Sequence, residues 1–169
     1  MKNLLFAAAA ATFTLTACST VSSILQNTFP YTATVLVTSG SPANVQLSAV
    51  SPAQSINQLT GAGANVKDIR VSSATMSVDS NTSMSMFKSV RVYLSNNGGN
   101  EVMVASRDVV PENVGSSLSL DINTSTTLDS MMKSGAVQAR VVYVLKQSPT
   151  SDISLKTSIG FSSVPVTNP

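Results

Sequence analysis

The sequence predicts an all-β protein, built as a single antiparallel β-sandwich. Apolar residues recur at every second position through much of residues 31–161, which is the period of a strand with one buried face. Short runs rich in Gly, Pro, Asn and Ser separate these stretches, as turns do between antiparallel strands. Charged residues make up only 11% of the chain, and Val, Thr and Ser are frequent, which favours strands over helices. We expect about seven or eight strands, two short helical connections, and an immunoglobulin-like or Greek-key topology.

The first two strands are expected over residues 31–38 and 45–49. In the first, Tyr31, Ala33 and Val35 alternate with threonines, so one face is apolar and the other polar. The turn sequence "SGSPA" lies between the two stretches.

Two short helices are expected in the connections. In the stretch "SPAQ", Ser51 is placed as an N-cap, Pro52 at the first helical position and Gln54 at the third, which completes a capping box. Residues 126–135 have apolar side chains on one helical face, an acid in the first turn, a lysine in the last and a glycine beyond the end.

The strand expected over residues 66–78 changes parity in its middle. Apolar residues occupy odd positions up to Val71 and even positions from Ala74 onward. A regular strand would turn its apolar side outward after this change, so the sequence predicts a β-bulge at Ser72 and Ser73.

The second half of the chain continues the two-residue period. In residues 88–95 three apolar side chains share one face, while Arg91 and Tyr93 take the other and could begin a binding face or form an ordinary solvated surface. The sequence "NNGG" at 96–99 predicts a hairpin turn, because Asn and Gly accept positive φ. Further strands are expected over residues 118–122, 137–145 and 153–161.

The first residues form a targeting segment. Lys2 precedes an apolar run over residues 4–15, which is shorter than the about 20 residues that a membrane span needs. The run ends in "LTAC", residues 15–18, which resembles the lipobox of bacterial lipoproteins. The resemblance implies cleavage between Ala17 and Cys18 and attachment of a diacylglyceryl group to the Cys18 sulfur. The alternative is an ordinary cleaved signal followed by a chance cysteine.

The lipobox resemblance implies an organisation and an address. Residues 1–17 would be the signal peptide, 18–30 a lipidated tether and 31–169 the β-sandwich domain. Two or three acyl chains make a lasting anchor, since each buried CH₂ contributes about 0.8 kcal/mol. Ser19 stands where an Asp would favour retention in the inner membrane, so we expect the cell envelope, and the outer membrane if the organism has two. From Met84 onward the hydrophobic spacing is also similar to uncharacterised β-sandwich envelope lipoproteins, a likeness that brings no activity.

Composition excludes several classes of function. The chain contains no histidine and a single cysteine, which removes Ser-His-acid and Cys-His catalysis and His-based zinc sites. The formal net charge is only +2 and the basic residues are scattered, so we expect no nucleic-acid partner. We also expect no cofactor.

Three local patterns in the sequence are candidate sites. Ser130 and Lys133 match S-x-x-K, which in enzymes resembling β-lactamases activates the serine, but the companion motifs are missing. Asp79 could offer alternating oxygens together with the residues at 81 and 83, although a loop turn explains the same pattern.

Met84 and Met86 form M-x-M, a pattern of soft thioether ligands for Cu(I). The same spacing also fills a core face, so the sequence leaves copper as a minor alternative. We expect a non-enzymatic, lipid-anchored envelope protein that acts as a structural or protein-interaction module. Its partners would be the membrane, through the N-terminal lipid, and another envelope protein. The alternative is a lipoprotein that binds a ligand or copper through the methionines or a sheet-edge cleft.

Overall fold

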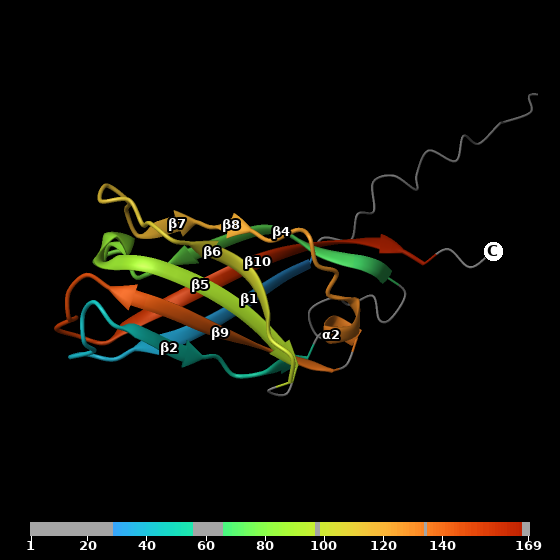
Figure 1. Ribbon diagram of the computed structural model, residues 1–169, viewed down its shortest axis with the longest axis horizontal. Coiled ribbons are helices and arrows are strands. Elements are labelled where there is room, and N and C mark those ends of the chain that lie inside the picture. Colours follow the sequence, from blue (N-terminus) through green and yellow to red (C-terminus); the bar gives the residue numbers. More distant parts are fainter. Residues whose placement is uncertain (1–28, 56–65, 97–98, 134, 167–169) are drawn as a thin grey trace, which may run out of the picture.

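Two sheets of antiparallel strands form the protein (Figure 1). The computed structural model describes residues 29–55, 66–96, 99–133 and 135–166. The four-stranded sheet has the order β1 (Phe29–Val37), β10 (Ile153–Pro165), β4 (Val66–Ser77), β7 (Ser117–Ser119). The six-stranded sheet has the order β2 (Gln46–Val50), β9 (Ala136–Leu145), β5 (Phe87–Asn96), β6 (Val102–Arg107), β8 (Asp121–Ile122), and β3 (Gln54–Ser55) also pairs with β9. The predicted all-β class with antiparallel strands is therefore confirmed.

The apolar faces of the two sheets share one core. Tyr31, Phe87 and Phe161 are its largest fully buried side chains. Burying a side chain of this size contributes roughly 1.5–3 kcal/mol, so the core stabilises the domain without any disulfide. The alternation predicted for the strands now at β1, β9 and β10 is confirmed, because their inward positions are all buried.

The bulge predicted at Ser72 and Ser73 is present in β4. Gly160 of β10 pairs with Ser73, whereas the next residue of β10, Phe161, pairs with Val71. Ser72 is therefore the extra residue, and it lets apolar side chains on both sides of the bulge face the core.

The prediction of a helix that begins at Ser51 is wrong for the residues that the structure describes. Gln54 and Ser55 form the strand β3 on the edge of β9, and residues 56–65 lie outside the described part of the chain. The Ser51 backbone N–H donates to Ala139 (2.8 Å), and its hydroxyl accepts from the Ala139 N–H (3.1 Å). Sheet pairing thus uses the groups that a helix cap would need.

The strand count was also too low. The described residues form ten strands, because the single strand expected over 118–122 is divided and because β3 replaces part of an expected helix. Its first part, β7, pairs with β4, and its second part, β8, pairs with β6 of the other sheet. The chain changes sheet at Leu120, whose N–H donates to the carbonyl of Ala74 (3.0 Å).

Two helical segments lie at opposite ends of the long axis. The predicted helix in 126–135 is confirmed as α2 (Asp129–Lys133), with Met131 and Met132 buried and Gly135 at a positive φ of 122°. The M-x-M pair forms the 3₁₀ helix η2 (Met84–Met86), in which Met84 is buried. The predicted hairpin at 96–99 joins β5 to β6, although residues 97 and 98 lie outside the description.

The molecule has two ends along its strands, a tether end and a loop end. The tether end holds the start of β1 at Phe29, two residues before the expected domain start, together with the end of β10 and α2. The loop end holds the β9–β10 connection, because Val37 at the far end of β1 pairs with Ile153. Figure 1 shows α2 and the β9–β10 connection at opposite ends.

Candidate functional site

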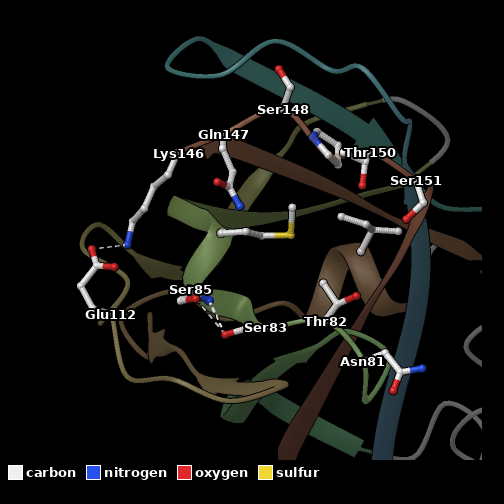
Figure 2. A pocket seen from close by; sticks show the side chains of 13 residues that line it. Asn81, Thr82, Ser83, Ser85, Glu112, Lys146, Gln147, Ser148, Thr150 and Ser151 are labelled. Atoms are coloured by element: carbon white, nitrogen blue, oxygen red, sulfur yellow. Dashed lines mark hydrogen bonds and ion pairs between the residues drawn. The ribbon is translucent and has the colours of Figure 1, made fainter.

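An open hollow lies at the loop end, where three connections meet (Figure 2). Its volume is about 600 Å³. The connection after β4, the segment before β7 and the β9–β10 connection build it, so residues distant in sequence converge there. Its lining residues are Asn81, Thr82, Ser83, Ser85, Met86, Glu112, Lys146, Gln147, Ser148, Pro149, Thr150, Ser151 and Ile153.

Hydrogen bonds fix one wall of this hollow. The Ser83 hydroxyl donates to the carbonyl of Val114 (2.6 Å) and accepts from the N–H of Ser85 (3.1 Å), which caps η2. Lys146 Nζ donates to Glu112 Oε1 (2.7 Å), and Figure 2 shows this ion pair at one side of the hollow. The charges therefore neutralise one another, and hydroxyl and amide groups supply the remaining polarity.

The Asp79 segment contributes to this hollow only in part. Its turn is confirmed, because the Thr82 N–H donates to the Asp79 carbonyl (2.8 Å). Asn81 and Ser83 line the hollow, whereas Asp79 is not among the lining residues. The structure thus does not bring the three oxygen groups together around the hollow.

The methionines do not gather at one place. Met84 is fully buried in the core, and only Met86 of the pair lines the hollow. Met131 and Met132 lie on α2 at the tether end, and Met103 is exposed on β6. Among the residues that the structure describes, no group of three or more His, Cys, Asp or Glu side chains could hold a metal ion. Copper binding at Met84 and Met86 stays a prediction.

The S-x-x-K residues lie on α2, far from the loop end. The side chains of Ser130 and Lys133 are exposed, and Lys133 Nζ lies 3.8 Å from Asp129 Oδ1. Asp129 also accepts from the N–H of Ile69 (3.1 Å), which fastens α2 to β4. Ser130 borders a smaller hollow of about 390 Å³.

The outward side chains of the six-stranded sheet form a second candidate surface. Arg140 Cζ lies 4.7 Å from the centre of the Tyr93 ring, and Arg140 Nε donates to Glu101 Oε1 (2.7 Å). This hydrogen bond lowers the pKa of Glu101 and raises that of Arg140. Arg91 makes a comparable pair with Asp108 at 2.9 Å.

Sequence reasoning placed Arg91 and Tyr93 outward, which is confirmed, but it missed Arg140 as their neighbour. The outward position of Arg140 in the alternating run of β9 was visible in the sequence. Its pairing with Tyr93 needed the register of β5 against β9, which periodicity alone does not provide.

Comparison with protein-family models and with curated proteins finds no match for this chain. None of the helices in the described ranges combines the length and apolar character of a membrane span. Ala17 and Cys18 lie outside the described residues, so the expected processing and lipidation site rests on the sequence.

Proposed function

We propose that this protein is a lipid-anchored component of a bacterial cell envelope, in which a non-enzymatic β-domain acts as a structural or protein-interaction module. The observation that carries the proposal is "LTAC" at residues 15–18, placed directly after a short apolar run. A diacylglyceryl group on Cys18, with a further acyl chain on the new amine, would hold the domain at a lipid surface. If the cell has two membranes, we assign the protein to the outer one.

The start of the folded domain is consistent with such an anchor. Phe29, the first residue of β1, follows Cys18 by eleven positions (29 minus 18). An extended chain covers at most about 3.3–3.6 Å per residue, so this tether reaches roughly 35–40 Å from the bilayer. It enters at the tether end, which leaves the loop end and the sides of both sheets free to meet a partner.

The absence of histidine and the commitment of the single cysteine to lipid support a non-catalytic role. Ser130 and Lys133 would be the remaining nucleophile and base, but Lys133 pairs with Asp129 on the same exposed helical turn. An activating lysine is expected to be desolvated instead.

We also propose that the sandwich has an immunoglobulin-like or Greek-key topology, in which strands cross repeatedly between the two sheets. The support is that the connections β1 to β2, β4 to β5 and β9 to β10 all change sheet, while β10 lies between β1 and β4.

Mass spectrometry of the protein extracted from membranes tests the anchor. We expect the mature chain to begin at Cys18 and to carry the mass of a diacylglyceryl group plus an amide-linked acyl chain. Cys18→Ser should lose the lipid mass and retain the signal segment. An unmodified Cys18 thiol in the native protein would refute the proposal.

A second candidate function is binding of a small polar ligand or Cu(I), which the hollow at the loop end favours. Only Met86 brings a thioether to this hollow, so copper binding there would depend on it. Titration with Cu(I) should then lose its signal in Met86→Leu, which keeps the volume. No binding to the unsubstituted protein would eliminate the copper form of this candidate.

A further inference from the structure

Two rows of outward side chains, one on each sheet, differ in chemistry, although Leu36 of β1 is also exposed on the four-stranded sheet. On the four-stranded sheet a row of directly paired residues crosses all four strands: Thr34, Lys156, Ser77 and Ser117. Its side chains are hydroxyls and one ammonium, which water solvates well. The corresponding row on the six-stranded sheet crosses β2, β9, β5 and β6: Val50, Arg140, Tyr93 and Met103.

This second row exposes apolar groups at both of its ends. Val50 is 50% exposed and Met103 is 37% exposed, and between them the Arg140 guanidinium lies over the Tyr93 ring. Tyr, Met and Arg are the residue types enriched where proteins bind one another. We call these four residues the β2–β6 row.

The neighbouring row on the same face is more polar. It consists of Ser48, Val142, Arg91 and Ser106. Val142 is only 7% exposed, although it points outward and lies outside the core cluster. Its neighbours therefore already cover it within one copy of the chain.

The charges on this face are balanced. Arg140 pairs with Glu101 and Arg91 pairs with Asp108, so each guanidinium already has a carboxylate partner. Covering the face would thus bury no unpaired charge. Burial of an unpaired charge would be strongly unfavourable.

We propose that this face of the six-stranded sheet binds the same face of a second copy of the chain. The two-fold axis lies in the interface, parallel to the strands and midway between β9 and β5. It places each row of one copy over the same row of the second copy, in the opposite order. Val50 then meets Met103 of the second copy, and Arg140 meets Tyr93 of the second copy. In the neighbouring row, Ser48 meets Ser106 of the second copy and Val142 meets Arg91 of the second copy. Val50 and Met103 form an apolar pair and Arg140 faces an aromatic ring, so each row is complementary to its own reverse, as an isologous interface requires.

The direction of this axis rests on the proposed lipid anchor. Both tethers must reach one bilayer, and a two-fold axis along the long dimension of the strands places both tether ends on the same side, so that neither tether has to extend along the domain. Four strands spaced about 4.8 Å apart give a contact only about 15–20 Å wide, so affinity in solution should be modest. Confinement to a membrane raises the effective concentration and favours the pair.

Thiol crosslinking of the full chain in its own membranes tests this arrangement. Ser48→Cys/Ser106→Cys places thiols at opposite edges of one face, about 14 Å apart within a copy but facing each other between copies. A bismaleimide shorter than that separation should yield crosslinked dimer. Thr34→Cys/Ser117→Cys has the same three-strand spacing on the other sheet and should remain monomeric. The unsubstituted protein shows the background from Cys18.

Charge substitutions distinguish crosslinking through the proposed interface from crosslinking of copies that merely collide in a crowded membrane. In the Cys background, Val50→Glu should cost most of the crosslinked dimer, because it faces the second copy's apolar Met103. Adding Met103→Lys should restore it, since the two charges meet only between copies. A weakening of about tenfold corresponds to about 1.4 kcal/mol. Thermal melting checks that each variant folds.

The outcomes are distinct from those of the anchor experiment. Equal crosslinking of the two Cys pairs, or no effect of Val50→Glu, would overturn the proposed interface even if Cys18 carries lipid. Specific, charge-rescued crosslinking together with an unmodified Cys18 would retain the interface and refute the anchor.

Discussion

Two buried hydroxyl side chains differ in their hydrogen bonds. Ser51 is 2% exposed and its Oγ accepts from the N–H of Ala139, 88 residues away in the sequence. Thr157 is fully buried on β10, opposite Ala33 and Met76, and within the described residues its hydroxyl has no hydrogen-bond partner. A buried hydroxyl without a partner costs the free energy of its lost hydration, so the two sites respond differently to substitution.

Thr157→Val should increase the free energy of unfolding by about 1 kcal/mol. Valine keeps the shape of threonine and removes the unsatisfied hydroxyl, so packing against Met76 is retained. Urea unfolding with an unchanged m-value measures this gain. Thr157→Ser is the matched control, since it keeps the hydroxyl, loses the methyl group and should destabilise. A loss of stability in Thr157→Val would mean that the hydroxyl is satisfied after all.

Tyr31 makes stability sensitive to alkaline pH. Burial raises the pKa of its phenol above the ordinary value of 10.0, while hydrogen bonds with Ser51 and Ala139 act in the opposite direction. The folded protein therefore holds this proton more tightly than the unfolded chain. The associated stability is present below about pH 10 and is lost as the pH rises through the folded pKa.

Tyr31→Phe should flatten the decline of the unfolding free energy above pH 10. The decline should not vanish, because burial also raises the pKa of Tyr143. Melting temperatures measured from pH 8 to 11 on Tyr31→Phe, Tyr143→Phe and the double variant separate the two contributions. An unchanged slope in the double variant would contradict this origin.

At the scale of the strands, the bulge in β4 depends on a glycine in its neighbour. A Cβ added to Gly160 would lie 2.5 Å from the Ser73 Oγ and 3.1 Å from the Ser72 Oγ. Gly160→Ala should therefore displace the exposed Ser73 hydroxyl and destabilise by about 0.5–1.5 kcal/mol, the cost of an unfavourable rotamer. Ser73→Ala removes the closest atom, so Gly160→Ala/Ser73→Ala should recover part of the loss. A double-mutant cycle of urea midpoints measures this coupling.

The strands that could be predicted are those whose burial repeats over many residues. β9 and β10 have long one-sided runs, and the parity change at Ser72 and Ser73 was enough to place the bulge. Local signals failed at Ser51, where a complete capping box was outweighed by pairing with Ala139 across the sheet. They also failed at Leu120, because a change of sheet leaves the apolar alternation unbroken.

At the scale of the whole molecule, both candidate surfaces depend on contacts between distant segments. The hollow joins residues near 82, 112 and 148, and the β2–β6 row joins four strands from positions 50 to 140. Neither set has a sequence motif, since its members come together only through strand register. The expected lipobox, by contrast, consists of adjacent residues, so the sequence alone is enough to propose a cellular location, whereas it does not indicate the two surfaces.

The anchor and the fold together predict an orientation. α2 lies at the tether end, because the Leu128 N–H donates to the carbonyl of Ile69 near the start of β4 (2.8 Å). Ser148 lies at the loop end, beyond the nine residues of β1. At about 3.3 Å per residue, β1 alone separates the two ends by roughly 25–30 Å. A chain attached at Cys18 should thus keep Ser130 of α2 closer to the bilayer, on average, than Ser148.

Fluorescence energy transfer to a dye in the lipid headgroups measures this orientation. The side chains of Ser130 and Ser148 are exposed, so Ser130→Cys and Ser148→Cys each provide a thiol for labelling. A lipidated Cys18 would not react with the thiol label. Transfer should be clearly stronger from position 130, because transfer efficiency falls steeply over the length of the domain. Equal transfer would indicate that the domain lies flat on the membrane, an arrangement in which the loop end is not held away from the lipid. Stronger transfer from position 148 would mean that the loop end lies closer to the membrane than the tether end does. The chain would then have to be attached to the membrane at a point other than Cys18.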